Sequence, residues 1–368
     1  MRRAGPASAL PTRPRAAALL LAAACLASAA SAETLLVVRK SGDALDFVDP
    51  GSGLRLASVA TGRAPHEVSV SPDGRRAVVS NYGTREQPGT TLSIVDLVEP
   101  RELRRIDLAP HSRPHGVAWF APDRIAVTAE GSGHLLVVDP DAARVVSAIA
   151  TGQDVSHMVT TTRDGRRAYV TSIRSGTATA FDLAEDRKLG DVNTGAGSEA
   201  LALTPDGSEL WVAARADGTI AVVDTATLEV TARIALPSIP IRIAMTPDGR
   251  TALVTCAGSA ELVALDVATR RERGRRKVDV PLAPGAAQRP FAGLAPGSPL
   301  PVGLLVANDG RTAYVAATMA DRVVQFDVAT LTPVRAMAVG GEPDGLAVTD
   351  VVPRAPCHAC TPAGHVTD

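Results

Sequence analysis

The stretch TPDGSELWVAARADGTIAVVDTATLEV, residues 204–230, decides the fold because its pattern recurs along the chain. It holds a Pro-Asp-Gly turn, an apolar strand, and a second apolar strand that ends at Asp224. Apolar strands ending in aspartate occur seven times, at Asp49, Asp96, Asp139, Asp182, Asp224, Asp266 and Asp327. All but one of the steps between them are 42 to 47 residues, which indicates an array of one repeated unit.

A second set of repeated positions lies in the turn that joins the first two strands of each unit. A Pro-Asp-Gly turn or a close variant occurs at Asp73, Asp123, Asp164, Asp206, Asp248 and Asp309. Proline fixes φ and glycine accepts positive φ, which suits a tight hairpin. The pattern therefore predicts four short strands, A to D, in each unit. A repeat of about 40 to 45 residues that contains four strands is typical of a β-propeller blade. We predict an all-β, seven-bladed β-propeller with four antiparallel strands per blade.

The two ends of the repeat array complement each other. The N-terminal text TLLVVRKS, ALDFVD and LRLASVA supplies strands B, C and D without a strand A. The C-terminal text EPDGLAVTD, residues 342–350, aligns with strand A alone. We expect these segments to pair into one blade, because closing the ring removes the open sheet edges that favour aggregation.

Several strand B segments carry a family resemblance. RAYVTS (167–172), SELWVAA (208–214), RTALVTC (250–256) and RTAYVAA (311–317) each follow a hairpin turn. They resemble the YVTN family of bacterial propellers, including YncE-like periplasmic proteins, over roughly residues 34–350. That family is similar to the haem-d1-binding and copper-bearing propellers of denitrification. The resemblance implies the propeller fold and makes a transition metal or haem a candidate cofactor.

The first 32 residues differ from the rest of the chain. Four arginines, Arg2, Arg3, Arg13 and Arg15, precede the apolar run AAALLLAAACLASAA (16–30), whose last residue begins the cleavage motif Ala30-Ser31-Ala32. This predicts a Sec-type signal peptide cleaved after Ala32 and a periplasmic or secreted protein. The run is too short for a membrane span, so we expect no spanning segment after cleavage. The predicted domains are the signal peptide (1–32), the propeller (33–350) and a tail (351–368) containing Cys357-x-x-Cys360.

The tail cysteines lack a histidine directly after the second one, which excludes a c-type haem attachment site. We predict that the tail is disordered or, in an oxidising compartment, closed by a small disulfide loop; the alternative is that the two cysteines form half of a zinc site. The net charge of -1 and the pI of 6.7 give no support for a nucleic-acid partner.

One position at the start of each strand A is the candidate site, since equivalent positions of a closed ring face one axis. Its occupants are His66, His115, His157, Glu199, Ile241, Val302 and Asp344. Imidazoles with carboxylates suit zinc, copper or iron, and a channel histidine suits an axial haem position. The candidate metal ligands are therefore His66, His115, His157, Glu199 and Asp344. The alternative is a structural role, in which these imidazoles bond the backbone of incoming loops.

Two insertions, residues 83–90 and 282–303, are predicted on the face where the strands A begin. The second is interpreted either as a lid over the channel or as a surface loop. Arginines on that face favour a carboxylated or phosphorylated ligand. The candidate ligand-binding residues are Asn81, Tyr82, Arg113, Arg174, Arg215 and Arg289.

Three functions remain open from the sequence. The leading one is an exported propeller that binds a small ligand or a periplasmic protein partner on the insertion face. The first alternative is a metal- or haem-binding propeller that uses His66, His115 and His157. The second is a lactonase-like hydrolase, because SRPHGVAW (112–119) distantly resembles the histidine-bearing strands of those propellers. No nucleophile with its base stands out, so the sequence favours binding over catalysis.

Overall fold

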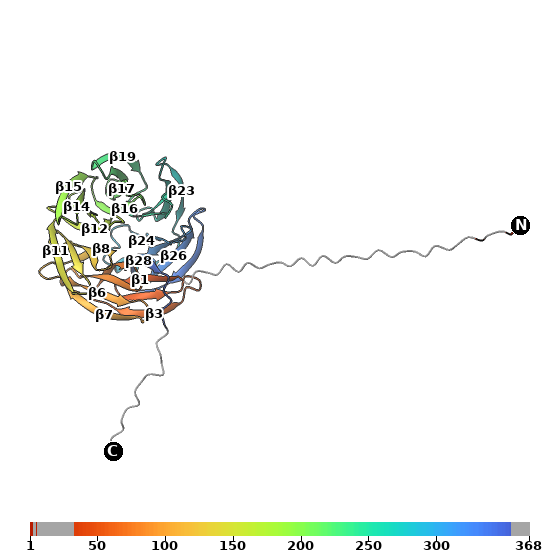
Figure 1. Ribbon diagram of the computed structural model, residues 1–368, viewed down its shortest axis with the longest axis horizontal. Coiled ribbons are helices and arrows are strands. Elements are labelled where there is room, and N and C mark those ends of the chain that lie inside the picture. The colour runs from red at the N-terminus through yellow and green to blue at the C-terminus, as the bar shows by residue number, and fades with distance from the viewer. Residues whose placement is uncertain (3–4, 6–32, 355–368) are drawn as a thin grey trace, which may run out of the picture. The chain divides into compact units, whose positions relative to one another are not determined.

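The computed structural model describes Met1, Arg2, Gly5 and residues 33–354, and within them the chain forms 28 strands and two short 3-10 helices. The strands make seven four-stranded antiparallel sheets around one axis (Figure 1). The predicted fold class is confirmed. The predicted signal peptide, apart from Met1, Arg2 and Gly5, and the tail cysteines lie outside the described residues.

Blades are numbered along the chain, with their strands given from the axis to the rim. Blade 1 contains β4 (Pro65–Val70), β5 (Arg76–Gly83), β6 (Pro88–Asp96) and β7 (Arg101–Asp107). Blade 2 contains β8 (Pro114–Ala121), β9 (Arg124–Ala129), β10 (His134–Asp139) and β11 (Arg144–Ala150). Blade 3 contains β12 (Ser156–Thr161), β13 (Arg167–Ser172), β14 (Thr177–Asp182) and β15 (Arg187–Asn193). Blade 4 contains β16 (Ser198–Leu203), β17 (Glu209–Ala214), β18 (Thr219–Asp224) and β19 (Glu229–Ala235). Blade 5 contains β20 (Pro240–Met245), β21 (Thr251–Cys256), β22 (Glu261–Asp266) and β23 (Glu272–Lys277). Blade 6 contains β24 (Pro301–Val306), β25 (Thr312–Ala317), β26 (Arg322–Asp327) and β27 (Pro333–Ala338). Blade 7 contains β28 (Pro343–Thr349), β1 (Thr34–Arg39), β2 (Ala44–Val48) and β3 (Arg55–Ala60). The 3-10 helices are η1 (Ala286–Gln288) and η2 (Thr318–Ala320).

The ring closes through blade 7, in which both ends of the array share one sheet. The C-terminal strand β28 pairs antiparallel with β1, and Leu36 lies opposite Ala347. The predicted pairing of N-terminal strands B to D with a C-terminal strand A is confirmed. In Figure 1 β28 lies near the axis and β3 at the rim.

The core lies between neighbouring blades. Leu253 and Leu262 of blade 5 pack with Val315 and Phe326 of blade 6, all fully buried. Burying one such side chain contributes about 1.5–3 kcal/mol. Leu36 of blade 7 belongs to a similar cluster with blade 1, so closure of the ring also buries apolar surface.

The repeated aspartates stabilise turns. The Asp224 carboxylate accepts hydrogen bonds from the N–H groups of Ala226 and Thr227, both at 2.9 Å. The Asp206 carboxylate accepts one from the N–H of Ser208 at 3.0 Å. These carboxylates cap backbone N–H groups in turns, which explains why aspartate recurs at the two positions.

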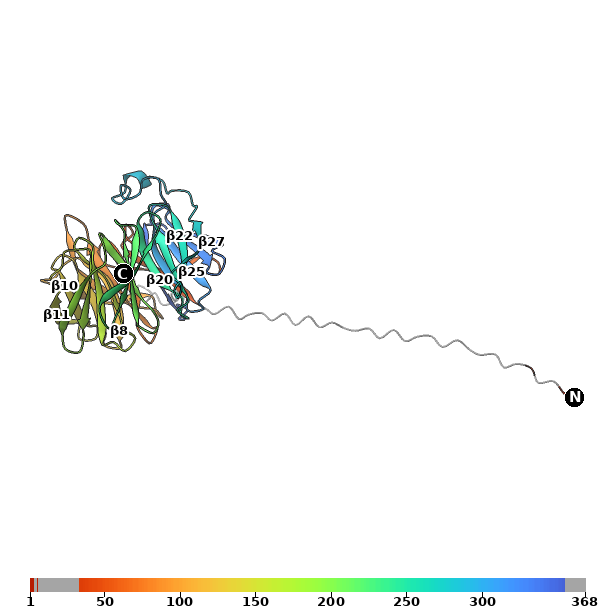
Figure 2. The same ribbon diagram turned by 90° about the horizontal axis from the view of Figure 1, so that it is seen from above.

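The segment between β23 and β24 rises above one face of the ring in the side view (Figure 2). Elsewhere in the described chain Cys256 is a buried free thiol. No helix within the described residues has the length and apolar character needed to cross a membrane.

Candidate functional site

Every innermost strand begins with the same local structure. A residue with positive φ is followed by proline or serine and then by the residue of the candidate column, as in Ala64-Pro65-His66. The pairing register with strand B shifts at this point in all seven blades. Such a bulge re-aims a side chain. Here it turns the same residue of each blade into the channel.

The innermost strands of neighbouring blades also lie in close contact. A Cβ on Gly303 would lie 1.9 Å from the carbonyl oxygen of Asp344, and one on Gly345 would lie 2.6 Å from that of His66. The Thr128 hydroxyl of blade 2 donates a hydrogen bond to the His157 carbonyl of blade 3 at 2.5 Å. The backbones that carry the candidate residues are therefore tied to one another.

The three histidines of the column meet at the channel mouth. His66 Nδ1 lies 3.2 Å from His115 Nε2. The rings of His115 and His157 stack with centroids 3.7 Å apart. Asp344 Oδ2 lies 3.4 Å from His66 Nδ1, and Glu199 Oε1 lies 3.6 Å from His157 Nε2. All five predicted residues of the column are buried together.

A carboxylate that the sequence analysis did not identify completes this group. Glu130 Oε1 accepts a hydrogen bond from His157 Nδ1 at 2.5 Å, and Glu130 Oε2 accepts one from the Tyr82 hydroxyl at 2.6 Å. One ligand atom from each of His115, Glu130 and His157 lies within 4.8 Å of the other two. This spacing suits a single metal ion after small side-chain movements.

Glu130 belongs to a second repeated position, three residues beyond the central valine of strand B. In the seven blades it is occupied by Lys40, Tyr82, Glu130, Ile173, Arg215, Ala257 and Thr318. Five of these residues line the chamber with the histidines. Extending the alignment of repeats past the end of strand B identifies this set.

The buried charges of the site are paired. Lys40 Nζ lies 3.2 Å from Asp344 Oδ2, and Arg215 forms an ion pair with Glu199. Arg242 of blade 5 reaches across the channel to Glu67 of blade 1. Sequence analysis missed Lys40, Glu67 and Arg242, because their repeated positions hold unlike residues in other blades.

The three imidazoles differ in their tendency to bind a proton. Burial, together with the charge of Lys40, lowers the pKa of His66 to about 3. Burial and the neighbouring His157 hold the pKa of His115 well below its usual value. Burial alone would also lower the pKa of His157, but hydrogen bonds to Glu130 and Glu199 raise it to about 9. His157 is therefore the charged imidazole at neutral pH.

The column residues line an inner cavity of about 220 Å³, which we call the chamber. Its roof comes from residues 282–300, which we call the lid, since Phe291, Leu294 and Leu300 line the chamber. The lid ends at Leu300, three residues before the end of the predicted insertion, because Pro301 begins β24. Its Ala286, Ala295 and Leu300 pack in one cluster with Ile241 and Val302.

The other insertion, 83–90, lengthens the hairpin between β5 and β6, and Gly83 pairs with Pro88. Both insertions reach one hollow at the channel mouth. This agrees with their predicted placement on one face.

Two of the six predicted ligand-binding residues line the chamber. These are Tyr82 and Arg215. Arg113 lies beside the chamber, with its guanidinium over the Tyr82 ring.

The other three make structural contacts instead. Asn81 is buried and bonds the backbone N–H of Gly62 at 2.9 Å. Arg174 is exposed and pairs with Asp154. Arg289 makes two hydrogen bonds to Asp321, at 2.8 and 2.7 Å, and these hold the lid.

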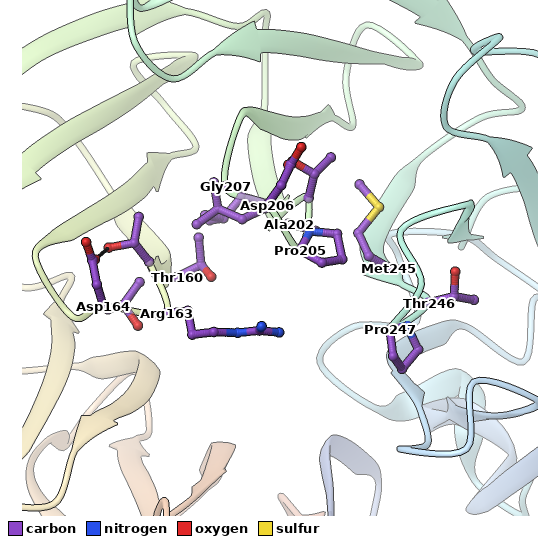
Figure 3. Close-up of a pocket in the computed structure, with 15 residues that line it drawn as sticks. Thr160, Arg163, Asp164, Ala202, Pro205, Asp206, Gly207, Met245, Thr246 and Pro247 are labelled. Carbon is purple, nitrogen blue, oxygen red and sulfur yellow. Dashed lines mark hydrogen bonds between the residues drawn. The ribbon is translucent and has the colours of Figure 1, made fainter.

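A larger hollow of about 830 Å³ lies at the other ends of the innermost strands of blades 3 to 5 (Figure 3). Arg163 points into the open space, while Asp164 and Asp206 are bonded within their own turns. No histidine lines this hollow in the described chain, and the candidate ligands lie at the opposite mouth.

Comparisons with known proteins give one family match over part of the chain and two solved structures of similar fold. Residues 120–264 match the family described as the cytochrome D1 heme domain. No curated protein matches the chain significantly. A chain of hydrazine synthase from Kuenenia stuttgartiensis is 19% identical, with a TM-score of 0.65, over 81% of this chain and 93% of that one. A functionally unknown protein from Desulfotomaculum acetoxidans DSM 771 is 14% identical, with a TM-score of 0.69, over 87% of this chain and 99% of that one. The family match favours the haem- or metal-binding alternative over the leading prediction of a ligand or partner scaffold.

The residues of the chamber fit a metal ion better than a haem. His115 Nδ1 and Asp344 Oδ1 are buried without a hydrogen-bond partner among the described residues, as expected of atoms that await a ligand. The chamber volume of about 220 Å³ is below the roughly 300–1,000 Å³ of ordinary organic-ligand pockets. A macrocycle therefore does not fit beneath the lid in this conformation.

Proposed function

We propose that this chain is a metal-binding β-propeller whose central chamber holds one transition-metal ion. The single observation that carries the proposal is the meeting of His115 on β8, His157 on β12 and Glu130 directly after β9, within 4.8 Å. Two imidazoles and one carboxylate form a donor set used for zinc, copper and iron. When bound, the ion would supply Lewis acidity or electron transfer.

The surrounding residues support this role. Tyr82 orients Glu130 through its hydroxyl, and Arg215 orients Glu199, as outer groups commonly do around metal ligands. His66, Glu199 and Asp344 are near enough to act as further or alternative ligands. The lid limits access of water to the chamber.

The same proposal includes export to the periplasm and membership in the YVTN family of propellers. Export to the periplasm is supported by the apolar run and the Ala30-Ser31-Ala32 site of residues 1–32. Membership in the YVTN propellers is supported by the repeated amino-acid sequence of strand B. A protein partner or a hydrolase activity has no comparable observation in its favour.

Metal content tests the proposal. We expect protein purified from a periplasmic extract without chelator to contain about one transition-metal ion per chain by elemental analysis. His115→Ala should keep the far-ultraviolet circular dichroism of the wild type and lose the metal. His111→Ala, which removes a half-buried histidine outside the chamber, is the matched control and should keep the metal.

A metal-free wild type that also fails to take up Cu²⁺ or Zn²⁺ would overturn the proposal, as would unchanged metal in His115→Ala. A visible absorption spectrum of the same sample separates the two cofactor classes. We expect no intense haem band.

A further inference from the structure

A second hollow lies outside the chamber at the same mouth of the channel. It has a volume of about 580 Å³, and we call it the vestibule. Residues 83–86 of the β5–β6 hairpin form one side, and Pro290 and Phe291 of the lid form the other. Lys40, His66, Tyr82 and Phe291 line both the vestibule and the chamber. Its volume lies within the range of pockets for small organic molecules.

The vestibule offers two aromatic surfaces with cations beside them. The Arg113 guanidinium carbon lies 5.2 Å from the centroid of the Tyr82 ring. Lys40 Nζ lies 4.2 Å from the centroid of the Phe291 ring. Phe291 is 40% exposed, although an aromatic ring normally gains by burial. Glu86 and Glu342 also line the vestibule. A flat apolar molecule whose negative charge meets Arg113 would complement the cations and the rings.

Arg113 differs from four other cations around the mouth. Lys40, Arg215, Arg242 and Arg289 each form an ion pair with a carboxylate. Arg113 is half-buried, its guanidinium donates a hydrogen bond to the carbonyl oxygen of Arg85 at 3.2 Å, and it pairs with no carboxylate of the described chain. Its guanidinium retains donors for an incoming oxyanion.

The backbone holds Arg113 in a fixed place. It has the positive φ of 54° that precedes the bulge of β8, and His115 follows two residues later. Its N–H donates to the Gly89 carbonyl at 2.7 Å. The guanidinium is therefore carried by the same rigid turn that places a candidate metal ligand.

We propose that the vestibule binds a small organic carboxylate with a flat apolar body. The carboxylate pairs with Arg113, and the body lies between Tyr82 and Phe291. Arg85, exposed on the same hairpin, adds positive charge at the entrance. The inference goes beyond metal binding, because no metal ligand other than His66 is needed to form the vestibule.

Benzoate is the probe, titrated into the full-length mature chain by isothermal calorimetry. We expect saturable binding to the wild type and an affinity at least about tenfold lower in Arg113→Gln, since hydrogen bonds to a charged group contribute strongly. Phe291→Ala should also weaken binding, through loss of the apolar contact. Arg174→Gln, an exposed arginine paired with Asp154, is the control and should bind benzoate like the wild type.

Benzamide has the same size without the charge, and we expect it to bind at least about tenfold more weakly than benzoate. Absence of saturable benzoate binding, equal binding to Arg113→Gln, or equal binding of benzamide would each overturn the inference. Metal content measured on the same samples keeps the two proposals apart. Arg113→Gln should retain its metal, and a metal-free protein that binds benzoate would contradict only the metal proposal.

Discussion

At the scale of single residues, the site contains three histidines whose neighbours give them different pKa values. His66 and His115 face buried cations and one another, and both are held neutral. His157 lies between Glu130 and Glu199, and it would have to lose a proton before its imidazole could bind a metal ion. A repeated position therefore supplies both neutral and charged imidazoles.

His157 makes the stability of the metal-free protein depend on pH. Its folded pKa of about 9 lies above the value near 6.5 of an unfolded histidine, so its stabilising contribution is complete below pH 6.5 and is lost as the pH rises through 9. We expect this to amount to roughly 3 kcal/mol in the free energy of unfolding. Urea unfolding in EDTA at about pH 6 and pH 9.5 measures it, with His157→Gln as the comparison. The difference between wild type and variant should shrink at high pH, and a constant difference would contradict the assignment.

The histidine column could be predicted because the residues recur at one offset from the hairpin turn. Glu130 and Lys40 occupy a position that the repeat alignment also reaches, but it does not stand out, since it holds acidic, basic, aromatic and aliphatic residues in different blades. Asn81 resembled a site residue in sequence, yet it bonds Gly62 and the hydroxyl groups of β6. Only the direction of the side chain separates it from its neighbour Tyr82.

At the scale of elements, the bulge at the start of each innermost strand matters most. In the sequence, the bulge is marked only by the proline or serine before each column residue. The positive φ of the preceding residue and the pairing shift that turns the column side chain inward appear only in the structure. His115 stands one residue further from its hairpin turn than the other column residues because β8 has a second register shift near Ala121.

The lid gives a prediction of its own. Arg289 and Asp321 form a half-buried, two-bonded pair, and its loss should cost the lid on the order of 1.5 kcal/mol of local stability. We expect chymotrypsin to cleave after Phe291 about tenfold faster in Arg289→Ala than in the wild type. Arg174→Ala, which breaks an exposed pair, should be cleaved like the wild type. Equal cleavage in Arg289→Ala would show that this pair does not hold the lid.

At the scale of the whole molecule, the repeats decided the number of blades, the strand order and the shared blade before any side chain was placed. The pattern works because each unit must bury its apolar faces against its neighbours, so the period and the ring are linked. The lid and the cross-channel pair of Glu67 with Arg242 lie outside the pattern. They join residues far apart in sequence, and no periodicity encodes them.

Ring closure predicts the effect of truncation. Removing residues 341–368 takes away β28, which exposes the edge of β1 and the apolar cluster around Leu36. We expect this protein to be insoluble or to lack a cooperative thermal transition. A chain that ends after Arg354 keeps blade 7 intact and should melt within a few degrees of the full chain. Equal melting of both truncated chains would contradict closure through β28.

The most direct measurement of the central claim is X-ray diffraction from Cu²⁺-soaked crystals at the copper absorption edge. The account predicts one strong anomalous peak per chain within coordination distance of His115, Glu130 and His157. Anomalous peaks only at histidines outside the chamber, such as His111 and His134, or none in the chamber, would contradict it.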